Sequence, residues 1–250
     1  MTVEHRGFDP AFFEPLAGVE ERSFWFRARN RLIVSTIRRR FPDAGSFLEV
    51  GCGSGVVLAA LQEEFPSMRL VGAELYDEGL AIARRRLPDV QLVTADARAL
   101  DYDGEFDLVG AFDVLEHIDE DEEVLARMVR SVRPGGGVLV LVPQHRWLWS
   151  KHDEFVEHRR RYTRKDLVAK AERAEINVLE TTSFVMSLLP AMTAARVVDR
   201  LRNRTDPIGN LEPGPLNGVF ERMLDGERRL IERGVSLPFG GSLMLVGRKA

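Results

Sequence analysis

Apolar and polar residues follow one another in blocks of two kinds, which predict strands and helices in turn. Short, nearly uninterrupted apolar runs are typical of strands buried on both faces of a sheet. Longer segments with an apolar residue every three or four positions are typical of amphipathic helices. We expect strands at residues 47–50, 69–73, 90–95, 106–112, 138–142, 176–184 and 241–248. We expect helices at residues 20–41, 56–65, 77–87, 119–132, 164–174 and 216–233.

This alternation predicts an α/β fold with a parallel, doubly wound sheet. Ligands of such sheets bind in the crevice beyond the carboxyl ends of the strands. The arginine-rich helix at residues 20–41 carries an aromatic patch, Phe24, Trp25 and Phe26. This patch either closes over a ligand, which makes Trp25 a candidate substrate contact, or packs against the sheet edge.

The first predicted strand leads into a glycine-rich turn that contains Gly51, Cys52, Gly53 and Gly55. Because glycine has no Cβ, the backbone can turn tightly and approach a ligand at the N-terminus of the next helix. Dinucleotide-binding turns have the spacing G-x-G-x-x-G, but Val56 stands where their third glycine would be. With the acidic Glu49 before the turn, this spacing disfavours a nicotinamide cofactor.

Bulk composition excludes several classes of protein. The chain has 250 residues, 30% of them charged, and a net charge of −4, so we expect no nucleic-acid partner. The single cysteine, Cys52, excludes an internal disulfide and a cysteine-based metal site. Residues 1–10 lack the apolar core of a secretory signal, and the apolar stretch 184–198 is shorter than a membrane span needs. We therefore expect a cytoplasmic protein without a transmembrane segment.

Carboxylates follow three successive predicted strands. Glu74 closes the second strand, where a carboxylate can accept hydrogen bonds from both hydroxyls of a ribose. Asp96, beside Ala97, follows the third strand and can accept a hydrogen bond from an adenine amino group. Asp113 follows the fourth. One such residue is more often a helix cap or a solvated side chain, but three at neighbouring strand ends indicate a cofactor site.

Four segments taken together resemble the class I S-adenosylmethionine-dependent methyltransferases over about residues 45–145. They are LEVGCGSG at 48–55, the acidic Glu74, ADA at 95–97, and FDVLEHI at 112–118 followed by RPGG at 133–136. The resemblance implies a Rossmann-like sheet of seven strands whose last strand is antiparallel. It also implies S-adenosylmethionine as the cofactor and S-adenosylhomocysteine as the product.

The same resemblance implies roles for single residues. The backbone of Gly51 to Gly55 packs against the methionine part of the cofactor, Glu74 holds the ribose, Asp96 holds the adenine, and Asp113 lies near the methionine. The further cofactor contacts that we expect are Glu49, Cys52, Leu75 and Ala97.

Methyl transfer needs alignment and desolvation above all, and a base only if the acceptor arrives protonated. His117 has a suitable intrinsic pKa for that base, and Asp113 is the second catalytic candidate. A structural role for His117 in the loop after the fourth strand is the alternative.

Residues 144–164 follow the fifth strand and should overhang the cofactor crevice on the substrate side. The candidates there are Trp147, His158, Arg161 and Tyr162. Aromatic rings can stack on an acceptor, and arginine can pair with a phosphate or a carboxylate. A solvated basic face is the alternative for residues 159–161. The histidine spacings fit no usual zinc pattern, so we expect no metal.

We expect one domain over residues 1–250. It comprises a helical cap at 1–44, a cofactor-binding core at 45–184, a helical insertion at 185–239 and the last strand at 240–250. Within the insertion we predict an apolar segment at 185–198, a turn at 206–215 and the helix at 216–233. The apolar segment is a lid over a greasy substrate, a surface that contacts lipid, or a contact with a partner subunit, and the sequence does not separate these.

The predicted function is methyl transfer to an oxygen or nitrogen of a small-molecule, sugar or lipid-linked acceptor. DNA methylases of this class carry an Asn or Asp, Pro, Pro, aromatic motif after the fourth strand, where this chain has Asp113, Val114, Leu115 and Glu116. Two alternatives remain open: a nicotinamide-dependent oxidoreductase, and a protein that binds S-adenosylmethionine without catalysis. The oligomeric state is not predicted.

Overall fold

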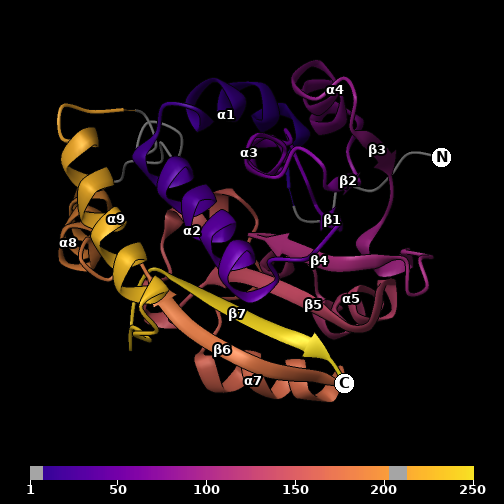
Figure 1. The fold of residues 1–250 in the computed structure, drawn as a ribbon. Coiled ribbons are helices and arrows are strands. Elements are labelled where there is room, and N and C mark those ends of the chain that lie inside the picture. The colour runs from indigo at the N-terminus through magenta and orange to yellow at the C-terminus, as the bar shows by residue number, and fades with distance from the viewer. Residues whose placement is uncertain (1–7, 203–212) are drawn as a thin grey trace.

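A twisted sheet of seven strands forms the centre of the molecule, with helices on both faces (Figure 1). The computed structural model describes residues 8–202 and 213–250. The strands are β1 (Ser46–Val50), β2 (Arg69–Glu74), β3 (Gln91–Thr94), β4 (Phe106–Phe112), β5 (Val132–Pro143), β6 (Ile176–Phe184) and β7 (Ser242–Lys249). Their spatial order is β3-β2-β1-β4-β5-β7-β6.

Strands β1 to β5 pair in parallel, and β7 lies antiparallel between β5 and β6. The predicted doubly wound, mostly parallel α/β sheet with an antiparallel last strand is thereby confirmed. The chain crosses from the β1 side to the β4 side of the sheet, so the strand order changes direction between these two strands. Ligand sites of open α/β sheets lie at such switch points.

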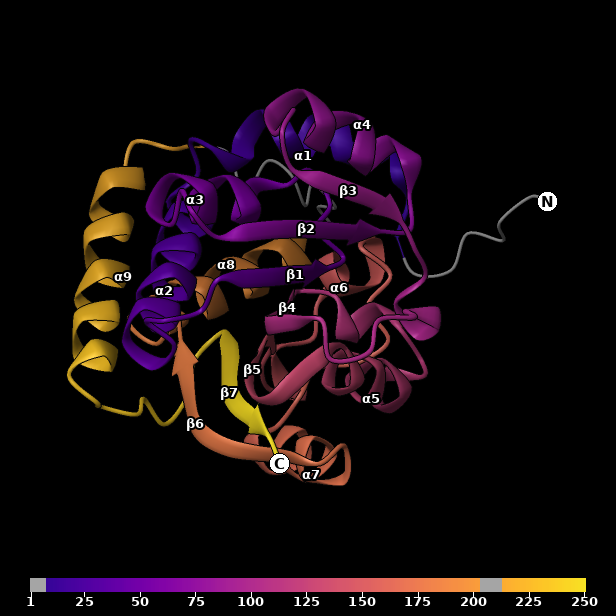
Figure 2. The ribbon, with the colours of Figure 1, turned by 45° about the vertical axis from the view of Figure 1, so that its right-hand side comes forward.

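Nine α-helices are described within these residues. They are α1 (Phe13–Glu20), α2 (Phe24–Arg40), α3 (Val56–Glu64), α4 (Asp77–Arg86), α5 (Asp121–Ser131), α6 (Lys151–Phe155), α7 (Arg164–Arg173), α8 (Leu189–Arg202) and α9 (Asn217–Glu232). Because alternate strand residues point to opposite faces, two cores form. One packs Phe47 and Leu108 against α2, α3 and α9, and the other packs Leu48 and Val109 against α5 and α7. Figure 2 shows how these helices lie around the sheet.

The single helix predicted at residues 20–41 is wrong in its N-terminal part. The chain turns after α1, and α2 begins only at Phe24. The amide of Phe24 donates a hydrogen bond of 2.9 Å to the side chain of Asn217, at the start of α9. A side chain far away in the sequence therefore satisfies one of the free amides at this helix end.

The fifth strand is longer than predicted. It begins at Val132, directly after α5, and includes the Pro-Gly-Gly-Gly stretch at 134–137 that was expected to precede it. Phe106 pairs with Val132 and Leu108 pairs with Gly137, so a bulge accommodates the extra residues.

Helix α9 lies along α2 on the outside of the sheet (Figure 1). Arg31 of α2 forms ion pairs with Glu221 at 2.8 Å and Asp225 at 2.9 Å, and the Phe24 ring contacts the Phe220 ring. The predicted helix at 216–233 is confirmed, whereas most of the turn predicted at 206–215 lies outside the described residues.

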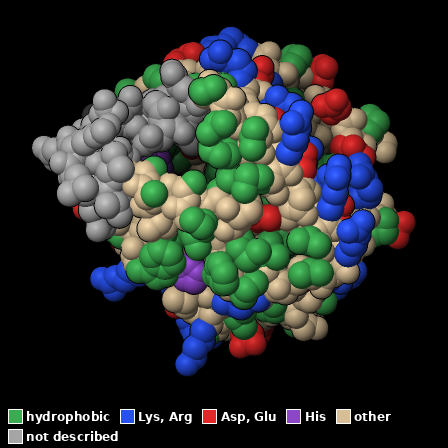
Figure 3. Space-filling view, turned by 90° about the vertical axis from the view of Figure 1, so that its left-hand side faces the viewer, with side chains coloured by type: hydrophobic (Ala, Val, Ile, Leu, Met, Phe, Trp, Pro, Cys, Tyr) green, Lys and Arg blue, Asp and Glu red, His purple; other side chains and the backbone are tan. Residues whose placement is uncertain are grey.

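The face that carries α8 and α9 shows several groups of hydrophobic side chains at the surface (Figure 3). Exposed apolar side chains of this region include Leu216, Val219, Met223 and Leu230. No helix in the described parts of the chain has the length and hydropathy to span a bilayer.

Gly110 in β4 offers a test of the packing around the switch point. A Cβ there would lie 2.7 Å from ring atoms of both Phe47 and Phe112, and these flat rings cannot bend away. We expect Gly110→Ala to lower the free energy of unfolding by about 1 to 3 kcal/mol, as overpacked cores do. Gly226→Ala is the control, because its Cβ meets no atom within 4 Å. In an exposed helix position that change should stabilise by about 0.5 to 1 kcal/mol. Urea denaturation measures both, and an unchanged Gly110→Ala protein would contradict the packing.

Candidate functional site

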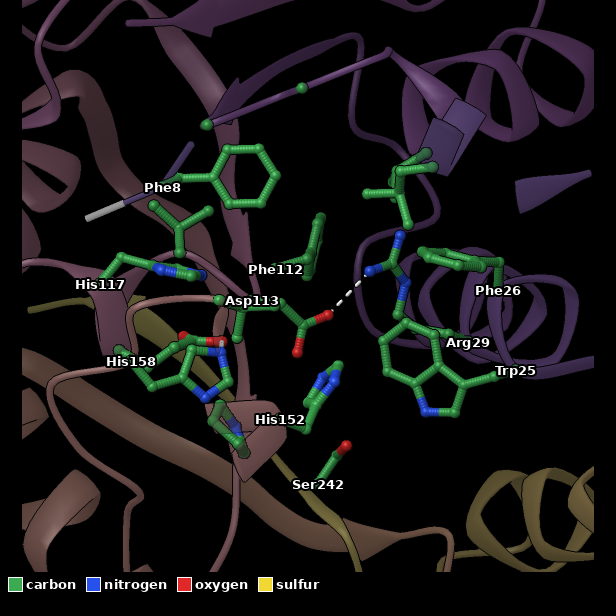
Figure 4. A pocket seen from close by; sticks show the side chains of 18 of the residues that line it. Phe8, Trp25, Phe26, Arg29, Phe112, Asp113, His117, His152, His158 and Ser242 are labelled. Atoms are coloured by element: carbon green, nitrogen blue, oxygen red, sulfur yellow. Dashed lines mark hydrogen bonds and ion pairs between the residues drawn. The ribbon is translucent and has the colours of Figure 1, made fainter. Parts of the chain in front are cut away.

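A cavity of about 1430 Å³ opens at the carboxyl ends of β1, β2 and β4. Ligand pockets are commonly about 300 to 1,000 Å³, so this cavity has room for two ligands side by side. Residues from the glycine turn, from the loops after the strands, from α2 and from α8 line it. Figure 4 shows Arg29 and Trp25 on one side of the cavity and His117 and His158 on the other.

The glycine turn forms one wall of the cavity. Gly51, Cys52 and Gly53 line it, and the amides of Gly51 and Cys52 donate to the Ala73 carbonyl at 2.8 and 3.1 Å. Gly51 has a φ of 70°, and a Cβ on it would lie 2.5 Å from Val114. The cavity lining does not include Gly55, whose missing Cβ instead leaves room for Leu87 after α4.

Glu74 is buried at the end of β2, against the glycine turn. Its carboxylate accepts backbone hydrogen bonds from Gly53 at 2.9 Å, Leu75 at 2.8 Å and Tyr76 at 3.0 Å. Burial raises the pKa of Glu74, although the three amides act in the opposite direction. These bonds hold the carboxylate in one orientation at the cavity wall, and Leu75 lines the cavity beside it.

Asp96 and Ala97 also line the cavity, after β3. Asp96 accepts a hydrogen bond from the Arg98 amide at 2.9 Å and forms an ion pair with the Arg98 guanidinium at 2.6 Å. The hydrogen bond from Arg98 lowers the pKa of Asp96. Asp96 thus caps a short 3-10 helix and also lines the cavity, so a capping role and a contact with a ligand are compatible.

Asp113 forms an ion pair that the sequence analysis missed. Its Oδ2 lies 2.7 Å from Nη1 of Arg29, which is buried between the rings of Trp25 and Phe26 at 4.8 and 5.0 Å (Figure 4). Asp113 has a φ of 57°, which is uncommon for a residue other than glycine. The aromatic and arginine-rich sequence of α2 marked this helix as a candidate contact with a ligand. Nothing in the neighbouring sequence identified Asp113 as the partner of Arg29.

The segment at residues 144–164, which we expected on the substrate side, contributes a buried hydrogen-bond network. Asp153 accepts from the Ser150 amide at 2.8 Å, from Arg161 Nε at 2.6 Å and from His158 Nδ1 at 2.9 Å. Burial raises the pKa of Asp153, but the bonds from His158 and Arg161 outweigh it and keep that pKa well below its usual value. Both His158 and Arg161 line the cavity, as does His152, whose pKa burial lowers to about 4.

Two of the predicted substrate contacts lie elsewhere. Tyr162 is fully buried, and its hydroxyl donates to Asp121 at 2.7 Å and lies 3.2 Å from the Leu115 carbonyl. Trp147 is 59% exposed and lines a separate surface hollow with Met186 and Leu189. An aromatic residue in a basic segment looks the same in sequence whether it contacts a substrate or belongs to a structural network. The sequence therefore could not distinguish these two roles for Tyr162 and Trp147.

The insertion supplies an apolar wall that sequence could not place. Leu188, Ala191, Met192 and Ala195 of α8 and its N-terminal flank line the cavity, together with Phe220 of α9. Apolar side chains of α1 and α6, among them Phe13 and Phe155, line it as well. The cavity therefore combines an acidic part around Glu49 and Glu74 with an apolar part under α8.

Comparison with known proteins shows that this chain is similar to methyltransferases. Residues 47–136 match the family model described as "Methyltransferase domain". Trans-aconitate 2-methyltransferase of Azoarcus sp. is 34% identical over 103 residues, 41% of each chain. Ubiquinone biosynthesis O-methyltransferase of Thiobacillus denitrificans is 33% identical over 144 residues, 54% of this chain and 57% of the relative. The chain thus spans about half the length of the curated relatives it matches.

A solved structure extends the likeness to nearly the whole chain. Phosphoethanolamine N-methyltransferase 2 of Haemonchus contortus, in complex with S-adenosyl-L-methionine, superposes with a TM-score of 0.63 at 17% identity. The match covers 96% of this chain and 57% of that one. At this identity the likeness shows the fold.

The buried carboxyl of Glu49 should make the stability of the protein depend on pH. Burial, opposed by the nearby Arg29, raises the pKa of Glu49 from 4.5 to about 8. Between these pH values the native state holds a proton that the unfolded state has lost, so stability falls as pH rises through this window. We expect Glu49→Gln to flatten this slope by at most about 1.4 kcal/mol per pH unit.

Urea denaturation of the cofactor-free protein between pH 4.5 and 8 measures the effect. Glu63→Gln, on the exposed end of α3, is the matched control and should keep the wild-type slope. Identical slopes for wild type and Glu49→Gln would show that Glu49 titrates normally.

Proposed function

We propose that this chain, which has the class I methyltransferase fold and carries a methyltransferase domain over residues 47–136, transfers a methyl group from S-adenosylmethionine to a small-molecule acceptor. The observation that carries the proposal is the Glu74 carboxylate, buried beside the glycine turn and fixed by three backbone amides at the wall of a large cavity. A carboxylate in this place suits a ribose diol.

The donor set of the cavity fits this cofactor. Glu49, Glu74 and Asp113 provide carboxyl groups around the glycine turn, and the positive charge of a sulfonium would favour their ionised form. In this assignment Glu74 holds the ribose, and Asp96 with Ala97 holds the adenine. The glycine turn would pack against the methionine part, and the Arg29 guanidinium, which lines the cavity, would pair with its carboxylate. When bound, S-adenosylmethionine supplies the methyl group and leaves as S-adenosylhomocysteine.

The acceptor occupies the other half of the cavity in this proposal. Leu188 and Met192 contact its apolar part, and the network of His158, Asp153 and Arg161 faces its polar part. An oxygen or nitrogen of the acceptor forms the new bond to the methyl carbon as the bond from that carbon to sulfur breaks. If the acceptor is protonated, its proton must leave, and the imidazole of His117 at the cavity wall can take it.

The cap and the insertion act with the core as one unit in this proposal. α1 and α2 close the cavity over the cofactor half, and α8 closes it over the acceptor half. Relatives named for trans-aconitate and for ubiquinone biosynthesis support a small organic acceptor but differ in its chemistry. Sugar and lipid-linked acceptors are included in the test below.

Glu74→Ala tests the cofactor half. Charge-assisted hydrogen bonds contribute about 1.5 to 3 kcal/mol, so the variant should bind S-adenosylhomocysteine roughly 10 to 150 times more weakly by calorimetry. Glu78→Ala removes a carboxylate from the exposed face of α4 and should bind like wild type. Unchanged affinity in the Glu74→Ala protein would remove this residue from the site.

Transfer of tritiated methyl into a host extract tests the reaction itself. The extract is separated after incubation into lipid, protein, nucleic-acid, polysaccharide and small-molecule fractions, and label is expected in the small-molecule fraction. Label in the lipid or polysaccharide fraction would replace the proposed acceptor class with that one. No label in any fraction, with tight S-adenosylhomocysteine binding, would favour binding without catalysis. Tight NADH binding instead would favour an oxidoreductase.

A further inference from the structure

Three side chains with metal-ligating atoms meet at the acceptor side of the cavity. Glu116 and His117 lie in the loop after β4, and His158 lies in the loop after α6. One ligand atom from each lies within 4.8 Å of the other two, and all three residues line the cavity. The spacing of these residues along the sequence does not reveal the cluster, because His158 comes from a different segment than Glu116 and His117.

Glu116 is buried, and its carboxylate oxygens form no hydrogen bonds with the described residues. Its exposed fraction is 0%. Its Oε1 lies 3.8 Å from Nε2 of His158, which is too far for a hydrogen bond. A buried polar group without a partner is costly, so a ligand that satisfies it stabilises the protein.

The spacing suits an ion between these atoms. Nitrogen and oxygen ligands lie about 2.1 Å from a zinc ion, which puts two tetrahedral ligands roughly 3.4 Å apart. The observed 3.8 Å between Glu116 and His158 is close to this value. The His117 ring stands at 74° to the His158 ring with 4.8 Å between centroids, and one of its ring nitrogens lies within 4.8 Å of the ligand atoms of the other two residues.

The surrounding residues hold the ligands as they do in known metal sites. His158 Nδ1 is 2.9 Å from Asp153 Oδ1, which also accepts from the Arg161 guanidinium. The carboxylate therefore accepts the Nδ1 proton and leaves the Nε2 lone pair directed at Glu116. Ligating histidines commonly donate their second ring N–H to a carboxylate in this way. The Arg159 amide also donates to the Glu116 carbonyl at 2.7 Å, which joins the two loops.

We propose that Glu116, His117 and His158 bind one divalent transition-metal ion at the acceptor side of the cavity. Two imidazoles and one carboxylate are a ligand set of catalytic zinc sites and of other first-row metals, whereas magnesium prefers oxygen ligands. Three protein ligands leave coordination positions for water or for an oxygen of the acceptor.

The role of this ion rests on the proposed function, although its binding does not. A metal-bound oxygen loses its proton more readily, so the ion would select an acceptor that presents a hydroxyl. Coordination occupies the imidazole of His117, and the ion then replaces this residue as the group that activates the acceptor.

Metal titration of the tag-free, chelator-treated full chain tests the site. Calorimetry with Zn²⁺ should give one ion per chain, and Co²⁺ should give visible absorption bands from nitrogen and oxygen ligands. Glu116→Gln and His158→Gln should each weaken Zn²⁺ binding by at least tenfold. Asp153→Asn, which removes only the supporting carboxylate, should weaken it 10- to 100-fold. His145→Gln is the control, because His145 lies in the same region outside the cavity lining, and it should bind Zn²⁺ like wild type.

Failure of wild type to bind Zn²⁺ or Co²⁺ stoichiometrically would overturn the proposal. Wild-type affinity in both Glu116→Gln and His158→Gln would overturn it as well. If these variants do not fold, His117→Gln, at a position less buried than Glu116, decides in the same way. S-adenosylhomocysteine binding is measured on the same metal-free wild-type sample, so loss of the metal site and loss of the cofactor site are told apart.

Discussion

The parallel register of β1 with its two neighbours is the constraint on which the candidate site depends. Val50 pairs with both Ala73 of β2 and Ala111 of β4, so the three strands end at the same level. The glycine turn, Glu74 and the loop that begins at Asp113 are brought together by this alignment alone. The bond from the Gly53 amide to Glu74 then fixes the turn to the neighbouring strand.

Features that depend on residues close to one another in the sequence were predictable from it. Apolar runs located all seven strands, and the turn chemistry located the glycine wall, because both are determined over a few residues. The start of α2 was not predictable, since it depends on Asn217. Arg29 and Tyr162 were not predictable for the same reason. Their partners Asp113, Leu115 and Asp121 lie 41 to 84 residues away in the sequence and become neighbours only in the folded chain.

The two halves of the cavity differ in charge and in origin. The half that we assign to the cofactor is built by the strand ends and contains buried acids, of which Glu49 and Glu74 have pKa values that burial raises. The half that we assign to the acceptor is built by α8 and by the segment around Asp153, and it combines apolar side chains with histidines. A common core with a separately built acceptor wall explains how one fold can serve relatives with different acceptors.

A crystal structure of the chain with S-adenosylhomocysteine is the decisive experiment for the proposed cofactor site. We expect both ribose hydroxyls within hydrogen-bond distance of the Glu74 carboxylate, and the adenine beside Asp96 and Ala97. We also expect the sulfur to face the half of the cavity lined by His117 and His158. A nucleoside bound away from Glu74, or a sulfur that faces away from those histidines, would contradict it.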